Sequence, residues 1–309
     1  MSQYQCFPAL IYNLGMSSKQ LVWLVTGTSS GFGQRLVKSA LGRGDYVIAS
    51  ARSLKKLEET LQKSPGNEEK LRLLELDVTS GFANIKHQID AAVKIFGRIE
   101  VLVNNAAQVL LNTIEEGGTN CLREQFEVNV FGAIDTANAV IPYMRAQGSG
   151  TIVNIGSRSA WKPEIVGVGP YGSSKAALHA LTETLALELA PFNIQVLLVA
   201  PGAFRTEGAY VYGEPWAKAE LIPEYEAARG ATSSRLAATR AVLKGDPDKA
   251  MEAVVDVVRG EGVASGRELP LYLILGDDAE VDIRAKLGKV GKALDEWVDV
   301  TRSLSLDTT

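Results

Sequence analysis

Short apolar runs alternate with segments of helical spacing along the first two thirds of the chain, and this alternation constrains the fold most strongly. The runs have no polar face, which is typical of strands buried on both sides of a parallel sheet. We expect strands at 21–25, 46–51, 71–76, 99–103, 151–155, 194–199 and 269–275. We expect helices at 34–41, 54–62, 85–96, 121–145, 173–189, 248–259 and 282–300. Right-handed crossovers then give an α/β fold, a doubly wound parallel sheet with helices on both faces.

The composition is that of an ordinary globular protein, with 46% apolar and 22% charged residues among 309. We expect one domain over 19–309, preceded over 1–18 by an aperiodic and poorly ordered extension. Met16 is a second candidate start, because the first strand begins only near Leu21. No apolar run approaches the roughly 18 residues that a membrane-spanning helix needs, so we expect no membrane span.

Charge and cysteine content argue against several classes of protein. A net charge of −4, without a long block of Lys or Arg, argues against a nucleic-acid-binding surface. Cys6 and Cys121 are too few for a disulfide framework, so we expect a reducing, cytoplasmic compartment. His87 and His179 have no partners at metal-ligand spacing. We interpret both as surface or packing residues and expect no metal site.

A glycine-rich loop joins the first predicted strand to the first predicted helix. It reads TGTSSGFG over 26–33, with the spacing Gly-x-x-x-Gly-x-Gly. Glycine lets backbone amides approach a pyrophosphate, and the N-terminus of the helix attracts its negative charge. We therefore interpret the loop as a nucleotide site rather than an ordinary tight turn. The predicted cofactor contacts here are Gly27, Ser29, Ser30, Gly31, Phe32 and Gly33.

Further motifs follow in an order that resembles the classical short-chain dehydrogenase/reductase (SDR) family. Beyond the glycine loop, the matching positions are Asp77, Val78, Asn104, Asn105, Ala106, Ala107, Asn129, Ser157, Tyr171, Lys175, Pro201, Gly202 and Thr206. The resemblance covers about 21–206 and implies a Rossmann-type sheet and a nicotinamide-dependent oxidoreductase. There are two departures within it. Ala107 stands where the family usually has glycine, and the gap from Ser157 to Tyr171 is one residue longer than the commonest spacing.

The resemblance also implies how the cofactor is held. Asp77 matches the family residue that meets the adenine, and Lys175 matches the one that holds the nicotinamide ribose. Thr206 and the backbone at Gly202 and Phe204 would bind the carboxamide. The implied cofactor contacts outside the glycine loop are therefore Asp77, Val78, Asn104, Ala106, Tyr171, Lys175, Pro201, Gly202, Phe204 and Thr206.

The end of the second predicted strand indicates which cofactor is bound. A dinucleotide site normally has an acidic residue there, which binds the ribose 2′-hydroxyl. This strand instead ends in Ala51, Arg52 and Ser53. Arg52 is placed to pair with a 2′-phosphate, and a guanidinium makes that contact in bidentate fashion. We expect NADP(H); the alternative is that Arg52 is a solvated residue that caps the next helix.

Tyr171 and Lys175 lie four residues apart near the start of a predicted helix, so their side chains project from one face. A phenol is a poor acid/base at neutral pH because its pKa is near 10, and a neighbouring ammonium favours the phenolate. Ser157 can hydrogen-bond the substrate oxygen. The family uses the residue at Asn129 to bind a water linked to the lysine. We expect interconversion of a ketone and a secondary alcohol, with Tyr171 as acid/base.

The predicted substrate is a bulky, weakly polar carbonyl compound or alcohol, enclosed by 161–170 and by a lid at about 204–245. Candidate lining residues, each of which is also interpreted as packing, are Trp161, Val166, Phe204, Tyr210, Tyr212, Trp216 and Leu221. Two alternatives remain open: a cofactor-sensing binding protein, and an NADP-dependent isomerase or lyase. The resemblance implies a homodimer or homotetramer, because relatives pack the helices at 121–145 and 173–189 against their copies.

Overall fold

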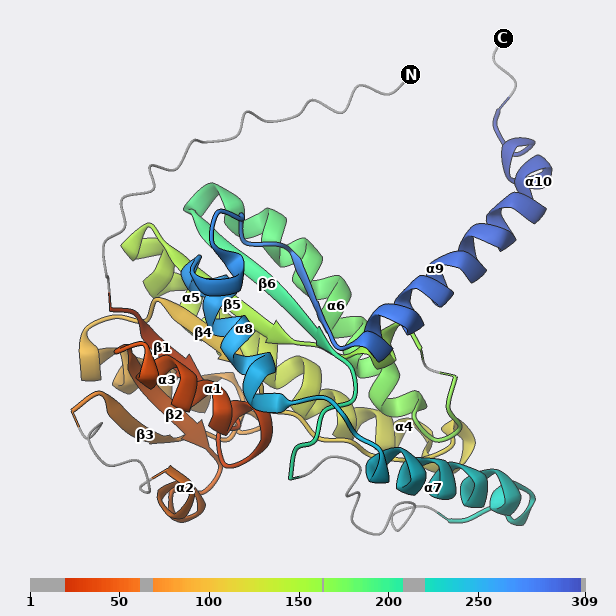
Figure 1. Ribbon diagram of the computed structural model, residues 1–309, viewed down its shortest axis with the longest axis horizontal. Helices are drawn as coiled ribbons and strands as arrows, with labels where there is room; N and C mark the ends of the chain where they lie inside the picture. Colours follow the sequence, from red (N-terminus) through yellow and green to blue (C-terminus); the bar gives the residue numbers. More distant parts are fainter. Residues whose placement is uncertain (1–19, 62–68, 163, 208–219, 307–309) are drawn as a thin grey trace.

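A seven-stranded sheet of order β3-β2-β1-β4-β5-β6-β7 lies at the centre of the computed structural model, which describes residues 20–61, 69–162, 164–207 and 220–306 (Figure 1). Every neighbouring pair of strands is parallel. The predicted doubly wound α/β sheet is therefore confirmed. The strands are β1 (Val22–Val25), β2 (Tyr46–Ala51), β3 (Leu71–Glu75), β4 (Val101–Asn104), β5 (Gly150–Ile155), β6 (Ile194–Pro201) and β7 (Tyr272–Leu275).

Helices cover both faces of this sheet. The helices of the described ranges are α1 (Gly31–Gly42), α2 (Leu54–Leu61), α3 (Phe82–Phe96), α4 (Ile114–Phe126), α5 (Gly132–Gln147), α6 (Gly169–Leu189), α7 (Glu226–Ala241), α8 (Pro247–Arg259), α9 (Asp277–Glu296) and α10 (Val298–Arg302), of which α9 and α10 project away from the sheet (Figure 1). Short 3₁₀ turns lie at Arg158–Ala160, Ala190–Phe192, Pro223–Tyr225 and Gly262–Ala264. None of the helices within the described ranges combines the length and apolar character needed to cross a bilayer.

Two hydrophobic cores explain why the strands are apolar on both faces. Trp23 and Val25 of β1 pack with α1 and α8, whereas Val22 and Leu24 pack with α3 and α5 on the opposite face. Because successive side chains of a strand point to opposite faces, a strand between two cores needs apolar residues at every position. All four of these side chains have no solvent exposure.

The order of the strands places a crevice at one edge of the sheet. The chain runs outward from β1 through β2 to β3, then returns to the other side of β1 with β4. The loops that follow β1 and β4 therefore diverge at their carboxyl ends, which is where ligands bind in open α/β sheets. The glycine-rich loop follows β1, and the 104–107 motif follows β4.

The prediction of one helix over 121–145 was wrong in detail. The chain forms α4, then a π-helical turn over Glu127–Phe131, and then α5. A π turn holds an extra residue without changing the apolar character of the segment, so periodicity does not show it. Asn129 sits within this turn. The next predicted helix also begins earlier than expected, at Gly169, so Tyr171 lies inside the first turn of α6.

One prediction lies wholly outside the described residues, and another lies partly outside them. These are the extension over 1–18 and the part of the lid that carries Tyr210, Tyr212 and Trp216. The described part of the predicted lid contains α7, which packs Leu236 against Leu111 and Val168 in a small third core.

Candidate active site

A cleft of about 430 Å³ opens at the carboxyl ends of β1 to β4. Most of the predicted cofactor contacts of the glycine loop line it, together with residues that follow β2, β3 and β4. The lining residues are Gly27, Ser29, Ser30, Gly31, Phe32, Ala51, Arg52, Lys56, Leu76, Asp77, Val78, Thr79, Asn105, Ala106, Ala107, Gln108, Val128 and Thr206. Gly33 does not line the cleft. It packs so closely below the loop that an added Cβ would lie 2.5 Å from the carbonyl oxygen of Gly27.

The glycine loop is held to the loop after β4 by hydrogen bonds between side chains and the backbone. Nδ2 of the Asn105 side chain donates to the carbonyl oxygens of Thr26 and Gly27, at 2.9 and 3.0 Å. The Thr26 hydroxyl in turn accepts from the backbone N–H groups of Asn105 and Ala106, both at 3.0 Å. Gly27 and Gly31 have φ angles of 69° and 63°, which favour glycine. Asn105 therefore shapes the cleft, a role that the sequence did not indicate.

Asn104, a predicted cofactor contact, lies beneath the cleft. Its side chain is buried and does not line the cleft. Nδ2 donates to Oδ1 of Asn154 at 2.9 Å and to the carbonyl oxygen of Ala133 at 3.1 Å. These bonds join β4 to β5 and α5 below the cleft. The motif alone could not separate the two asparagines, because the contact that occupies Asn104 comes from fifty residues further along the chain.

The far end of the cleft is basic. Arg52 and Lys56 both line it. Within the described ranges, no hydrogen bond or ion pair engages the Arg52 side chain, which leaves its guanidinium available to an anion. Asp77 is held in place because its Oδ1 accepts from the N–H and the hydroxyl of Thr79, at 2.9 and 2.8 Å.

A carboxylate occupies the anion-binding position at the N-terminus of α1. Glu207 accepts from the backbone N–H of Gly31 at 3.0 Å and from the Arg35 guanidinium at 2.8 and 3.0 Å. The hydrogen bond from Arg35, aided by that from Gly31, lowers the pKa of Glu207 to about 2. Its oxygens thus stand in for an anionic group at the phosphate loop, the position that a nucleotide phosphate takes in such loops.

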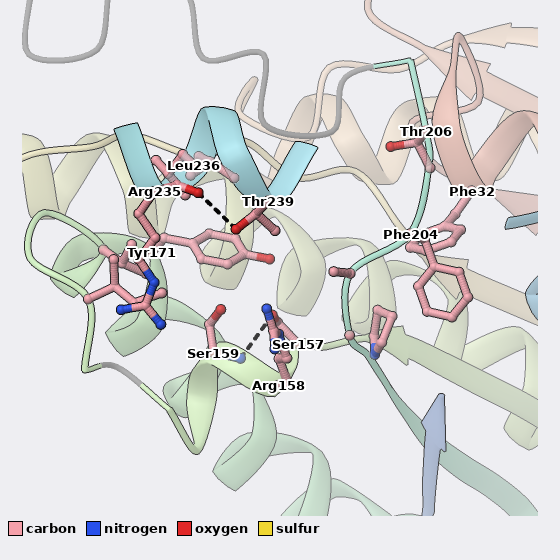
Figure 2. Close-up of a pocket in the computed structure, with 16 residues that line it drawn as sticks. Phe32, Ser157, Arg158, Ser159, Tyr171, Phe204, Thr206, Arg235, Leu236 and Thr239 are labelled. Carbon is pink, nitrogen blue, oxygen red and sulfur yellow. Dashed lines mark hydrogen bonds between the residues drawn. The ribbon is translucent and has the colours of Figure 1, made fainter. Parts of the chain in front are cut away.

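A second cavity of about 260 Å³ adjoins the cleft, and Phe32 and Thr206 line both. Figure 2 shows the phenol ring of Tyr171 extending into this cavity between α7 and the turn that carries Ser157. The other lining residues are Val109, Arg158, Ser159, Ile165, Val168, Pro201, Gly202, Ala203, Phe204, Arg235, Leu236 and Thr239. Of the residues that we predicted to line the substrate pocket, Phe204 does line this cavity. Trp161, Val166 and Leu221 do not line the cavity: Trp161 packs on His179, and the other two are about half exposed.

Lys175 lies buried one turn of α6 beyond Tyr171. Its side chain is 2% exposed, and Nζ donates to the carbonyl oxygen of Ile155 at 2.7 Å. Nζ is 5.9 Å from the centre of the Tyr171 ring. Burial lowers the pKa of this ammonium to about 8, because removal from water disfavours the charged form. A cation next to the phenol favours the phenolate of Tyr171.

Asn129 connects the π-helical turn to the turn of α6 that carries the tyrosine. Its Nδ2 donates to the Ser174 hydroxyl at 3.1 Å and to the carbonyl oxygen of Gln108 at 3.0 Å. Its Oδ1 accepts from the N–H of Gln108 at 2.9 Å. The Ser174 hydroxyl donates to the carbonyl oxygen of Tyr171 at 2.8 Å. This buried amide therefore fixes α6 against the loop after β4.

His179 is a site residue that the sequence analysis missed, since it was interpreted as a surface or packing residue. Its Nε2 accepts from the backbone N–H of Ser157 at 3.2 Å, and its ring packs 4.5 Å from the centre of the Trp161 ring. Burial, with a smaller contribution from the charge of Lys175, lowers the pKa of His179 to about 4. A Cβ on Gly156 would lie 2.1 Å from Nε2, so only glycine fits before Ser157. Only one feature of the sequence could have indicated this role: His179 lies four residues after Lys175, so both project from the same face of the helix.

The first turn of α9 is tied to both sides of the second cavity. Arg158, next to Ser157, pairs with Asp278 at 2.9 Å and with Asp282 at 2.6 Å. Asp278 also accepts from the N–H of Ala203 at 2.9 Å. A carboxylate of α9 therefore holds the serine turn against the segment that follows β6.

Comparison with known proteins assigns the family. Residues 21–214 match the family model described as short chain dehydrogenase. Oxidoreductase BOA17 of Botryotinia fuckeliana is 32% identical over 290 residues, covering 92% of this chain and 98% of BOA17. The crystal structure of a short-chain dehydrogenase from Streptomyces avermitilis has a TM-score of 0.77 and 35% identity, covering 93% of this chain and 100% of that one. The chain therefore belongs to the short-chain dehydrogenase family, and the resemblance noted in its sequence is confirmed.

Two more distant structures share the fold with different cofactors. A short chain dehydrogenase from Burkholderia cenocepacia J2315 in complex with NADP has a TM-score of 0.63 and 23% identity, covering 94% of this chain and 100% of that one. One from Burkholderia phymatum in complex with NAD has a TM-score of 0.72 and 21% identity, covering 94% and 98%. At these identities the likeness shows the fold alone. In the part of the chain that the structure describes, no cluster of three or more His, Cys, Asp or Glu side chains is arranged to hold a metal ion.

Proposed function

We propose that this oxidoreductase interconverts a ketone and a secondary alcohol with NADP(H), on a bulky apolar substrate, and that Tyr171 is the acid/base. The observation that carries the proposal is the junction of the two cavities at Phe32 and Thr206. One cavity has the glycine loop and a basic end suited to a dinucleotide. The other contains Tyr171 and Ser157, with the buried Lys175 beside the phenol.

Three observations on the chain itself fit a nicotinamide dinucleotide. The N–H of Gly31 already binds a carboxylate, so the loop binds anions. Arg52 and Lys56 line the far end, where a 2′-phosphate would lie, and this favours NADP(H) over NAD(H). Asp77 and Val78 line the cleft between these two points, where we propose that the adenine binds. The backbone at Gly202 and Phe204, with Thr206, would bind the carboxamide.

In the proposed mechanism the cofactor supplies or accepts the hydride, and the side chains handle the proton. Tyr171 donates its phenolic proton to the carbonyl oxygen as negative charge develops there, and takes it back in the oxidation direction. The Lys175 ammonium lies close to the phenol ring, and its positive charge stabilises the resulting phenolate. Ser157 donates a hydrogen bond to the same substrate oxygen and so stabilises the developing alkoxide. Asn129 keeps the turn that carries Tyr171 in register.

The walls of the second cavity support the proposed class of substrate. Val109, Ile165, Val168 and Leu236 present apolar surface. We propose that the region 204–245 acts as a lid that excludes water from the reacting atoms. Its described helix, α7, forms one wall. The Thr232 hydroxyl donates to the carbonyl oxygen of Val166 at 3.2 Å, which holds α7 over the loop after Ser157.

We also propose a homo-oligomer in a reducing, cytoplasmic compartment. Cys121 is buried and forms no disulfide within the part of the chain that the structure describes, which is in keeping with a reducing compartment. Exposed apolar side chains lie on the π-helical turn and on α6: Phe131 is 50% exposed, Leu181 41% and Leu187 78%. Apolar groups of this size on neighbouring helices favour self-association.

A cofactor-consumption screen tests the proposed function. Purified protein is mixed with NADPH or NADH and a panel of aromatic, polycyclic and small aliphatic ketones, and loss of absorbance at the reduced nicotinamide band is followed. We expect turnover with NADPH and with the bulky apolar ketones. Tight NADPH binding without turnover of any ketone or alcohol would instead support a cofactor-sensing protein.

A further inference from the structure

A cation that the proposed mechanism does not use lines the second cavity. Arg235 belongs to α7 and borders the space into which Tyr171 extends. Figure 2 shows the Arg235 guanidinium reaching down from α7 on one side of the Tyr171 hydroxyl, with Phe204 and Thr206 on the other side. The cofactor is proposed to bind on the side of Phe204 and Thr206. Arg235 therefore faces the part of a substrate that extends away from the cofactor, beyond the reacting carbonyl.

The packing of α7 fixes which of its residues face the cavity. Leu236 is buried in the third core, and the Thr232 hydroxyl donates to the loop after Ser157. At about 100° per residue, Arg235 lies about 60° from Thr232 and about 40° from Thr239 around the helix axis. Thr239 lines the cavity as well. The side chain of Arg235 is solvent-accessible, but it stands at the edge of the packed face of α7 and not on its free surface.

The positive charge of Arg235 is not neutralised within the part of the chain that the structure describes. No hydrogen bond or ion pair engages its side chain there. Its own helix offers no partner, because 227–245 holds four basic residues and no acidic one. An acid three or four positions away would stabilise the helix by pairing with the arginine. Its absence leaves the guanidinium available to a ligand.

Arg158, which also lines the cavity, is in the opposite situation. It pairs with Asp278 at 2.9 Å and with Asp282 at 2.6 Å. Its charge is thus committed to holding the serine turn to α9. None of the described residues that line the cavity is acidic. Among these lining residues, Arg235 is the cation whose charge has no acidic partner.

A cavity wall of this composition favours a ligand with one negative charge. A guanidinium binds a carboxylate in bidentate fashion, through two parallel hydrogen bonds. A carboxylate carries a single charge and so matches one unpaired cation, whereas a phosphate ester carries about 1.5 to 2 negative charges. Val109, Ile165 and Val168 make the neighbouring wall apolar. The group that joins the carboxylate to the reacting carbonyl should therefore be apolar.

We propose that the substrate is an oxo acid or the corresponding hydroxy acid, whose remote carboxylate is bound by Arg235 while Tyr171 and Ser157 contact the carbonyl oxygen. This inference rests on the proposed function and narrows its bulky apolar substrate to one that carries a single negative charge. The carboxylate takes no part in the bond changes. The hydride passes between the cofactor and the carbonyl carbon, and the proton passes between Tyr171 and the carbonyl oxygen. Arg235 is thus a specificity-determining residue.

Matched acids and esters test the role of the charge. The probes are para-acetylbenzoate, levulinate and longer methyl-keto acids, each compared with its methyl ester in the presence of NADPH. Wild type should show a kcat/KM about tenfold or more higher for the acid, as expected for a charged hydrogen bond. Arg235→Met keeps an apolar stem but removes the charge, so this ratio should fall to about one, with an intermediate ratio for Arg235→Lys. The chain length of the best acid then measures the spacing between Tyr171 and Arg235.

Arg240→Met is the matched control. Arg240 is an exposed arginine of the same helix that does not line the cavity. This variant should keep the wild-type ratio, and both methionine variants should keep the wild-type melting temperature. An equal kcat/KM for acid and ester in wild type overturns the proposal. An equal fall of the ratio in Arg235→Met and Arg240→Met overturns it as well.

Calorimetry separates this inference from the proposed function. Para-ethylbenzoate carries the carboxylate but no ketone, so its binding needs no turnover, and para-ethylbenzamide is its neutral counterpart. With and without NADP⁺, wild type and Arg240→Met should bind the benzoate about tenfold more tightly than the benzamide, whereas Arg235→Met should bind both alike. This result without turnover of any ketone would contradict the proposed function alone.

Two other outcomes of the same titrations overturn the inference. Turnover of neutral ketones, with no preference for the benzoate over the benzamide, leaves the proposed function intact and contradicts the carboxylate site. Tighter binding of para-ethylphenyl phosphate than of para-ethylbenzoate would assign the site to phosphate esters instead.

Discussion

The segment from β1 to β6 and the segment after Pro201 are held together in different ways. In the first, the side-chain amides of Asn105 and Asn129 hydrogen-bond to backbone groups and set the shape of the cleft. In the second, charge pairs such as Arg158 with Asp278 and Arg229 with Glu116 attach elements to the first segment. The difference shows that the proposed cofactor cleft is shaped by side-chain amides bonded to the backbone, whereas the proposed substrate side is positioned by charge pairs between side chains.

The largest expected effect on stability concerns His179, which contacts the turn that carries Ser157. Its pKa is about 4 in the folded chain against about 6.5 in the unfolded chain, so the unfolded chain binds the proton more readily. Stability therefore falls as the pH drops from 6.5 to 4, by on the order of 3 kcal/mol when complete. In His179→Gln this part of the pH-dependent loss of stability should be absent. Urea unfolding of the variant and of wild type at pH 7, 5.5 and 4.5 measures it.

The exposed His87 supplies the control for that experiment. His87→Gln should keep the wild-type dependence of stability on pH between 6.5 and 4, because the side chain lies on the surface of α3. If His179→Gln and wild type lose equal stability over this range, the imidazole is not buried in its neutral form.

A smaller effect is expected where the serine turn meets α6. Gly156→Ala puts a Cβ 2.1 Å from Nε2 of His179, so the turn that carries Ser157 must shift. Displacement of a positioned group by about 1 Å lowers turnover by roughly 100-fold. Steady-state kinetics should show that loss in kcat with cofactor affinity retained. The control is Gly230→Ala on α7, where an added Cβ meets no atom within 4 Å and activity should be unchanged.

The basic end of the cleft comes next in expected size. Arg52→Ala removes the guanidinium that we propose binds the 2′-phosphate, and charged hydrogen bonds contribute about 1.5 kcal/mol or more. The dissociation constant for NADPH should rise about tenfold or more, and that for NADH should stay within error. Lys55→Ala removes a neighbouring cation that does not line the cleft, and its affinities should match wild type. Equal binding of NADPH and NADH by wild type contradicts the assignment.

The smallest expected effect tests the phosphate loop. Glu207→Gln removes a negative charge from the N–H of Gly31, the position at which a nucleotide phosphate competes. NADPH affinity, measured by fluorescence titration, should rise about threefold, since charges at a helix end contribute about 0.3–1 kcal/mol. Asp248→Asn is the matched control, because Asp248 also pairs with Arg35 but does not contact Gly31. A weaker affinity in Glu207→Gln would show that the carboxylate supports the loop rather than competing with phosphate.

The sequence allowed prediction of those features that a few neighbouring residues determine. The glycine loop and the spacing of Tyr171 and Lys175 both follow from local geometry. Contacts between segments far apart in the chain produce no local sequence pattern, so they could not be predicted. Glu207 reaches Gly31 across 176 residues, and Asp282 reaches Arg158 across 124. The role of Asn104 in joining strands and the π turn at Asn129 also depend on packing that periodicity does not describe.

The central claim is that Tyr171 carries the proton, and Tyr171→Phe tests it most directly. Phenylalanine keeps the ring in the cavity and removes only the hydroxyl. With a substrate found in the screen, single-turnover kinetics under saturating NADPH should show a fall of about 1,000-fold or more, the size expected for loss of general acid catalysis. The NADPH dissociation constant should stay within about twofold, roughly 0.4 kcal/mol. Turnover within about tenfold of wild type would show that another group donates the proton.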